Sequence, residues 1–149
     1  MRLRMILAAA LATALAGCAT TAPAGNASED LILSRMLSGQ SVLQGKELEE
    51  AMVAASAYPL GSRENPVRAS RPQGQRAYLG RLKCADGSAP AFTRTGNLGP
   101  GVYGNIIDNY RVTCLGADGK EKTVNVVMDM YHAGFVETRP VPGFTIEAP

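Results

Sequence analysis

The chain has 149 residues, of which 46% are hydrophobic and 5% aromatic, with 15 Lys and Arg against 13 Asp and Glu. This length and hydrophobic content fit one small globular domain and exclude a disordered, highly charged protein. The net charge is only +2, without the clustered excess of Lys and Arg that a phosphate backbone requires, so the composition argues against a nucleic-acid-binding protein.

The first 17 residues have the pattern of a secretory signal peptide. Arg2 and Arg4 make the start positive, and an apolar run from Met5 to Leu15 follows. At about 1.5 Å per residue, this run is too short to cross the ~30 Å core of a bilayer as a helix. We therefore expect residues 1–17 to be a targeting segment that is removed.

The segment Leu15-Ala16-Gly17-Cys18 resembles the lipobox of bacterial lipoproteins. The resemblance implies cleavage before Cys18 and acylation of this cysteine, including its new amino group. Ala19 stands where Asp would signal retention in the inner membrane, so the same family rules imply the outer membrane. The expected partner at this end is outer-membrane lipid, because several acyl chains make anchoring effectively permanent. The alternative is an ordinary secretory signal followed by a chance cysteine.

Two further divisions follow from composition. Residues 18–28 begin with Cys18, and the ten residues after it are small, polar and uncharged, which is typical of a flexible tether. Residues 29–149 hold the rest of the apolar and aromatic residues, and we expect them to form one periplasmic domain.

Two short helices are predicted at the start of this domain. The first covers Glu29 to Leu37, where Gly39 ends it. The second follows Ser41, since Gln44 three residues later completes the pattern of a capping box, and it runs to about Ala57.

Four strands are predicted in the second half, where β-branched and aromatic residues gather. Asp86-Gly87 and Asp118-Gly119 favour two hairpin turns, because glycine adopts the positive φ that such turns require. The expected fold is α+β, with two N-terminal helices packed on a three- or four-stranded, mainly antiparallel sheet. The predicted strands are Arg76–Cys84, Ala91–Thr95, Ile106–Leu115 and Lys122–Tyr131.

Cys84 and Cys114 remain once Cys18 is assigned to lipid. An oxidising periplasm favours a disulfide between them, the alternative being two buried free thiols. The bond would close a loop of about 31 residues and contribute ~3.7 kcal/mol in the chain-entropy model. If Ala91–Thr95 turns back, the strands that end at the two cysteines run parallel, and both cysteines lie at the same end of the sheet.

His132 is the single histidine and the one candidate for acid–base chemistry. It would act as a general base with Asp129, Asp108 or Glu137 as the orienting carboxylate. The favoured alternative is a structural histidine at a strand end, bonded to the backbone. One histidine and two disulfide-bonded cysteines do not supply the three or four ligands of a zinc site, so neither a metal nor a cofactor is expected.

The segment Phe92–Asn105 is the leading candidate binding surface. It is rich in glycine, lies inside the disulfide loop and carries Arg94, Asn97 and Tyr103. The alternative is a plain connection between hairpins. The basic segment Gly61–Gln75 is a second candidate, for an acidic partner or lipid headgroups, unless it is a solvated linker.

Residues 58–68 and 128–144 are similar to segments of uncharacterised small lipoproteins of Gram-negative bacteria. Two helices followed by a sheet on a lipid tether also resemble, in layout, the small lipoprotein subunit of the outer-membrane β-barrel assembly machine. Neither resemblance implies an activity. We expect a non-catalytic, lipid-anchored periplasmic module that binds an envelope protein or polymer. The alternatives are an envelope hydrolase that uses His132 and a periplasmic enzyme inhibitor.

Overall fold

The computed structural model describes residues 27–116 and 118–149. The expected signal peptide, Cys18 and most of the expected tether lie outside these residues. Residues 27 and 28 belong to the first helix rather than to the tether.

The α+β prediction is confirmed: in the described residues, three helices accompany a five-stranded sheet in the order β3-β4-β5-β1-β6, and a separate pair joins β2 to β7. All strand pairs are antiparallel except β1 with β5, which run parallel. The elements are α1 (Ala27–Leu37), α2 (Gly45–Ala55), β1 (Val67–Ser70), α3 (Arg71–Arg81), β2 (Leu82–Lys83), β3 (Ala91–Pro100), β4 (Ile106–Leu115), β5 (Glu121–Asp129), β6 (Tyr131–Val136) and β7 (Thr145–Ile146).

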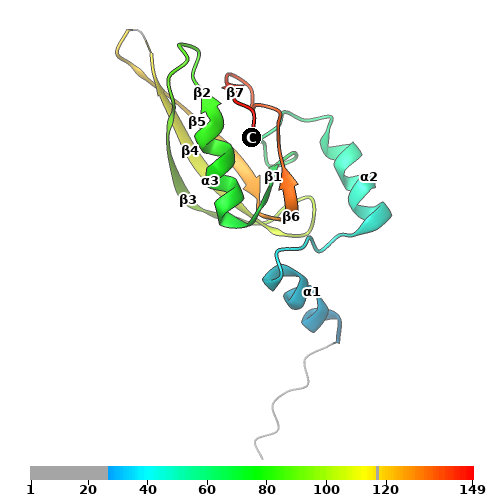
Figure 1. Cartoon of the computed structure of the whole chain (residues 1–149). Coiled ribbons are helices and arrows are strands. Elements are labelled where there is room, and N and C mark those ends of the chain that lie inside the picture. The colour runs from blue at the N-terminus through cyan, green and yellow to red at the C-terminus, as the bar shows by residue number, and fades with distance from the viewer. Residues whose placement is uncertain (1–26, 117) are drawn as a thin grey trace, which may run out of the picture.

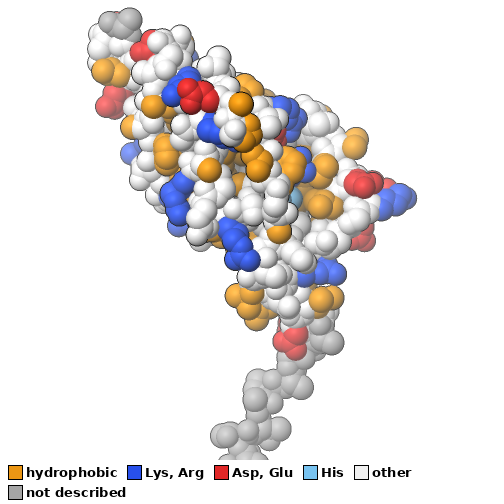
Figure 2. All heavy atoms as spheres, viewed as in Figure 1, with side chains coloured by type: hydrophobic (Ala, Val, Ile, Leu, Met, Phe, Trp, Pro, Cys, Tyr) orange, Lys and Arg blue, Asp and Glu red, His pale blue; other side chains and the backbone are white. Residues whose placement is uncertain are grey.

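The helix that covers the sheet is α3, which lies against β1 and β6 (Figure 1). Its Tyr78 and Leu79 are buried in the core together with residues from four strands. The two N-terminal helices form as predicted, but α1 stands apart from the sheet (Figure 1) and leaves Leu33 56% and Leu37 72% exposed. The apolar side chains of α1 are visible on its surface in Figure 2.

The predicted strand Arg76–Cys84 is wrong over most of its length, because α3 continues to Arg81 and only Leu82–Lys83 is extended. Gln75, Tyr78, Leu79 and Leu82 are buried, and their spacing of three, four and seven residues is that of one helix face. Pro72 in the first turn is compatible with a helix start, since that position needs no donated hydrogen bond.

The predicted linker Gly61–Gln75 is also corrected. It contains β1, which is an inner strand of the sheet, and the start of α3. Val67 pairs with Met128, and both side chains are fully buried. A four-residue strand between polar neighbours has little local signal, and its partner strand lies about sixty residues away in the sequence.

One of the two predicted hairpins is confirmed. Gly116 and Gly119 make the turn that joins β4 to β5. Asp86-Gly87 also forms a turn, but β2 pairs with β7 and β3 pairs with β4, so no hairpin joins β2 to β3. The predicted strand Lys122–Tyr131 is divided into β5 and the start of β6.

The start of α2 lies at Gly45 rather than directly after Ser41. The Val42 N–H donates to the Asn105 side chain 2.8 Å away, so this segment is held by the connection between β3 and β4 rather than by the helix. Gln44 does reach back to Ser41, where its side-chain amide donates to the carbonyl.

The predicted disulfide between Cys84 and Cys114 is present, with the two Cα atoms 5.9 Å apart. The expected route to it, through two parallel strands, is wrong because the segment before Cys84 is mostly helical. Cys84 instead follows β2, and it meets Cys114 near the end of β4.

Candidate functional site

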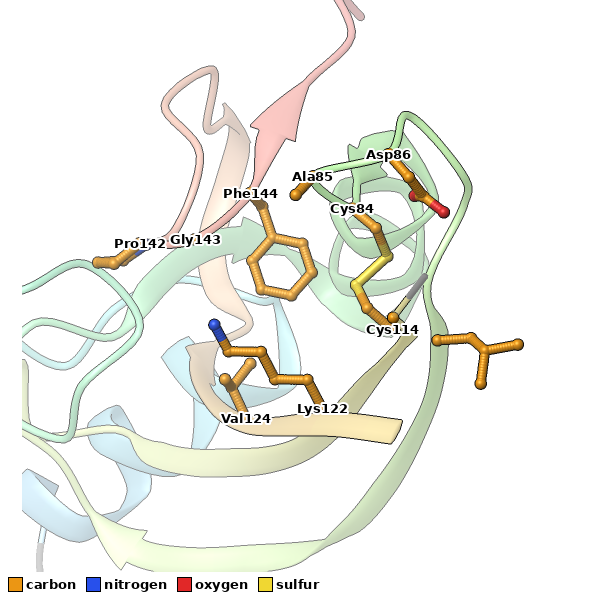
Figure 3. A pocket seen from close by; sticks show the side chains of 11 residues that line it. Cys84, Ala85, Asp86, Cys114, Lys122, Val124, Pro142, Gly143 and Phe144 are labelled. Atoms are coloured by element: carbon orange, nitrogen blue, oxygen red, sulfur yellow. A yellow bond between two sulfur atoms is a disulfide. The ribbon is translucent and has the colours of Figure 1, made fainter. Parts of the chain in front are cut away.

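A hollow of about 400 Å³ opens beside the disulfide, and we call it the distal pocket (Figure 3). It lies at the end of the molecule that carries the β4–β5 turn, opposite α1 (Figure 1). Three parts of the chain build it, and the side chains that shape it are Cys84, Cys114, Leu115, Lys122, Val124 and Phe144.

The wall on the Cys84 side is a turn that the sequence closes locally. The Cys84 N–H donates to the carbonyl of Ser88, and the Gly87 N–H donates to the carbonyl of Cys84. Asp86 accepts the backbone N–H and the hydroxyl of Ser88, and these hydrogen bonds lower its pKa. The Asp86 carboxylate is therefore occupied within its own turn, and in Figure 3 it lies beyond the disulfide from Phe144.

The interior of the distal pocket is apolar. The ring of Phe144 faces the disulfide on one side and Lys122 and Val124 on the other (Figure 3). Phe144 and Val124 are half-buried against the hydrophobic core, while Leu115 is 61% exposed at the rim. Binding of an apolar group to this surface is favourable, since burial of apolar surface contributes about 25 cal/mol of stabilisation per Å².

Lys122 supplies the charge of the distal pocket. Its side chain is exposed, and its ammonium lies within 4.0 Å of no carboxylate in the described part of the chain. The stem of a lysine can cover apolar surface while its charged end stays in water. Apart from Lys122 and the engaged Asp86, no side chain lining the pocket titrates, so the arrangement suits binding rather than acid–base catalysis.

His132 lies elsewhere, in a buried polar cluster with Ser41, Asn105 and Asp129. The Asn105 amide donates to Asp129 Oδ2 at 2.8 Å and to Ser41 Oγ at 3.0 Å. Asp129 also accepts the N–H of Tyr131 at 3.0 Å. This cluster connects the segment before α2 with the ends of β4, β5 and β6.

The contacts of His132 do not position it as a general base. His132 Nε2 lies 3.4 Å from Asp129 Oδ2 and makes no hydrogen bond with any described residue. The ring packs edge-on against Tyr103, with centroids 5.2 Å apart. Ser41 Oγ donates to the Tyr103 carbonyl instead of the imidazole, so the contact between nucleophile and base that defines a catalytic pair is not formed.

The structure brings only one of the three proposed carboxylates to His132. Asp129 is in contact, whereas Asp108 and Glu137 belong to other pairs. Asp108 accepts from Arg94 at 2.6 Å and from Gln75 at 3.0 Å. Glu137 is held by Arg139.

The proposed binding residues of Phe92–Asn105 do not share a surface. Most of this segment is β3 rather than a loop. Arg94 bonds to buried Asp108, which raises the pKa of the guanidinium. Asn97 is exposed on β3 and accepts the N–H of Gly99, while Tyr103 is only 1% exposed and belongs to the interior.

Sequence reasoning missed the distal pocket and the polar pair Gln75–Tyr110. The Tyr110 hydroxyl donates to Gln75 Oε1 at 3.0 Å, inside the sheet–helix interface. Ala85 and Leu115 stand just before the two Asp-Gly turns in the sequence, but their partner in the pocket, Phe144, lies far along the chain.

Neither a metal site nor a membrane-spanning helix is found in the described residues 27–116 and 118–149. No group of three His, Cys, Asp or Glu side chains is placed to hold a metal ion. No helix in this part of the chain is long and apolar enough to cross a membrane.

Comparison with known proteins gives no match. No protein-family model, no curated protein and no solved structure matches this chain. The role of the distal pocket is therefore inferred from its own geometry.

Proposed function

We propose that this protein is a lipid-anchored, non-catalytic interaction module of the bacterial cell envelope, and that the distal pocket is its recognition site. The observation that carries the proposal is the apolar hollow between Phe144 and the disulfide, at the end of the molecule away from α1 (Figures 1 and 3). The lipobox-like segment before Cys18 supports the anchor, and it supports outer-membrane lipid as the partner at that end.

The position of α1 supports the orientation. Eight residues separate Cys18 from Ala27, and an extended chain spans at most ~3.6 Å per residue. An acylated Cys18 would hold α1 within about 30 Å of the membrane and leave the distal pocket facing the periplasm.

The occupant we propose is an apolar side chain of an envelope protein, next to an acidic residue that pairs with Lys122. An aliphatic or aromatic side chain fits the surface made by Phe144, Val124 and Leu115. Lys122 has no carboxylate partner in the described structure, so an acidic neighbour would complement its charge.

A hydrolase that uses His132 is the second candidate, because His132 and Ser41 line one hollow of about 370 Å³. Against it, His132 is buried, and Ser41 is bonded to other groups. No feature of the described structure favours the inhibitor alternative.

The experiment is a cross-linked pull-down of the full chain from membranes, with partners identified by mass spectrometry. Leu115→Glu puts a charge at the rim of the distal pocket, and Val102→Glu is the matched control on an exposed apolar residue between β3 and β4. We expect one envelope protein to be captured by the wild type and Val102→Glu, and to be lost with Leu115→Glu.

A Cys18→Ser variant tests the anchor in the same experiment, and we expect it to leave the membrane fraction. Capture of the same proteins by Leu115→Glu would overturn the role of the distal pocket. Capture of a polymer instead of a protein would overturn the proposed occupant. Turnover of an envelope substrate that is lost in His132→Ala would favour the hydrolase.

A further inference from the structure

Arg68 lies on β1, and its guanidinium is fixed from two sides. It stacks over the ring of Phe135 at 4.0 Å from the centroid, and Nη1 lies 2.8 Å from Met52 Sδ of α2. The side chain is half-buried. Arg68 is therefore a positive charge held in place by an inner strand and not a mobile surface group.

No carboxylate forms a direct ion pair with Arg68 in the described residues, although its charge helps to lower the pKa of Glu137, which lines two of the neighbouring hollows. No carboxylate oxygen of residues 27–116 or 118–149 lies within 4.0 Å of its nitrogens, and its N–H groups donate to no oxygen there. An arginine stays charged and carries five N–H donors. Desolvating part of such a group without an acceptor costs free energy.

The neighbouring arginines of the same basic segment are used differently. Arg63 donates to the carbonyls of Leu98 and Pro100, and Arg71 donates to the carbonyl of Ser38. The nearby carboxylate of Glu137 is already taken by Arg139, through two hydrogen bonds of 2.9 Å each. Arg68 thus leaves one uncompensated positive charge among these contacts.

Three hollows meet at the stacked pair of Arg68 and Phe135, and we call them together the Arg68 groove. They have volumes of about 360, 330 and 370 Å³. One runs beside α2, and another contains the polar side chains of Gln40 and Gln44. The third is bordered by Ala77 and Tyr78 of α3 and is largely apolar.

We propose that the Arg68 groove binds a carboxylate attached to a short apolar group. The planar guanidinium fork matches the two oxygens of a carboxylate, and a single uncompensated charge suits a monoanion better than a phosphate dianion. The apolar part lies in the hollow beside Ala77. This site goes beyond the proposed function, because none of its residues lines the distal pocket.

The test is a titration of the full chain followed by NMR, with four probes. Hexanoate and N-acetylphenylalanine present the same carboxylate from a fatty acid and from a peptide end, and their amides are the neutral controls. We expect both acids to shift the Nε–H resonance of Arg68, and their amides to bind at least tenfold more weakly. The acid that binds more tightly shows whether the natural ligand is a fatty acid or the carboxyl end of a peptide.

Variants complete the test. Arg68→Gln should lower the affinity for the acids at least tenfold, and Arg68→Lys should lower it less, because the charge remains while the fork is lost. Arg76→Gln, which removes an exposed arginine of α3, should have no effect. If Arg68→Gln does not fold, the affinity of Arg68→Lys and the resonance shifts of the wild-type protein test the proposal.

Three results would overturn the proposal. One is that neither acid shifts the Arg68 resonance at millimolar concentration. The second is that an acid and its amide bind equally. The third is that inorganic phosphate binds more tightly than both acids.

Discussion

Asn105 joins two segments that are far apart in the sequence. It is fully buried, donates to Ser41 and Asp129, and accepts the N–H of Val42. A side-chain amide can do this because it carries both a donor and an acceptor group. In the sequence, however, an asparagine after Gly104 reads as an ordinary turn residue.

Glu137 is buried and accepts four hydrogen bonds. Burial by itself would raise its pKa, but hydrogen bonds from the side chain and backbone of Arg139, with the charge of that arginine, outweigh burial. The pKa of Glu137 therefore lies below the ordinary value for a glutamate. Its charged form is the one that the folded state favours.

Glu137→Gln should reduce the acid sensitivity of folding. The pKa is lower in the folded than in the unfolded state, so Glu137 stabilises the fold above the unfolded value of about 4.3. That contribution is lost as the pH falls from about 5 through the folded value. We expect the variant to be about 1–2 kcal/mol less stable at pH 7, and we expect this difference to shrink as the pH falls toward 3.

Urea unfolding at pH 7, 5, 4 and 3 measures this difference. Glu64→Gln, on an exposed residue outside the ion pairs of the described structure, is the matched control. A constant difference between Glu137→Gln and wild type over the whole pH range would contradict the prediction.

Among the elements, α3 is a helix in a segment whose composition favours a strand. Tyrosine, as at Tyr78, is common in strands, and glycines such as Gly74 and Gly80 weaken a helix. Cys84, which follows α3, is also compatible with the end of a strand. The burial of Gln75 and Leu79 on one face shows that packing against β1 and β6 outweighs these preferences.

Gly80→Ala should stabilise the protein by about 0.5 kcal/mol, because alanine loses less backbone freedom than glycine when a helix forms. Gly80 is helical and exposed, and a Cβ there would meet no atom within 4 Å. Gly87→Ala should instead destabilise the protein, because Gly87 has a φ of +83°, which alanine adopts only with strain. Thermal denaturation compares the two, and a loss of stability in Gly80→Ala would argue against the helix.

The strand β3 forms an exposed edge of the sheet. Its register with β4 shifts between Arg94 and Gly96, and again between Asn97 and Pro100. Gly96 and Gly99 have φ of 149° and 75°, which a residue with a side chain rarely adopts. Such irregularities make an edge a poor template for further strands.

At the scale of the whole molecule, the disulfide closes the distal end. Its cysteines are 30 residues apart in the sequence, and they join the turn after β2 to the end of β4. Because Cys84 carries one wall of the distal pocket and Cys114 another, the same bond stabilises the fold and shapes the site.

Replacing both cysteines, as in Cys84→Ala with Cys114→Ala, should destabilise the protein by about 3–4 kcal/mol for a loop of this length. We also expect the double variant to lose the partner captured through the distal pocket, at temperatures where it is still folded. Urea unfolding with and without reductant measures the first effect in the wild type. An unchanged midpoint on reduction would contradict the prediction.

Local signals in the sequence were sufficient to predict the α+β class, α1, α2, the strands β4 and β5, and the disulfide. Helix-ending Gly39, alternating residues around Val124 and the Asp-Gly turn are local signals that act within a few residues. The cysteine pairing followed from having two candidates in an expected oxidising compartment. The contact of His132 with Asp129 was also within reach, since the two are three residues apart.

The remaining features depend on contacts between residues that are far apart in the sequence. The inner strand β1 exists because Val67 is buried against Met128, and the distal pocket exists because Phe144 comes beside the disulfide. The burial of Tyr103 and the isolation of Arg68 depend in the same way on residues far along the chain. Such contacts depend on which surfaces the whole chain buries together, and local propensity does not contain that information.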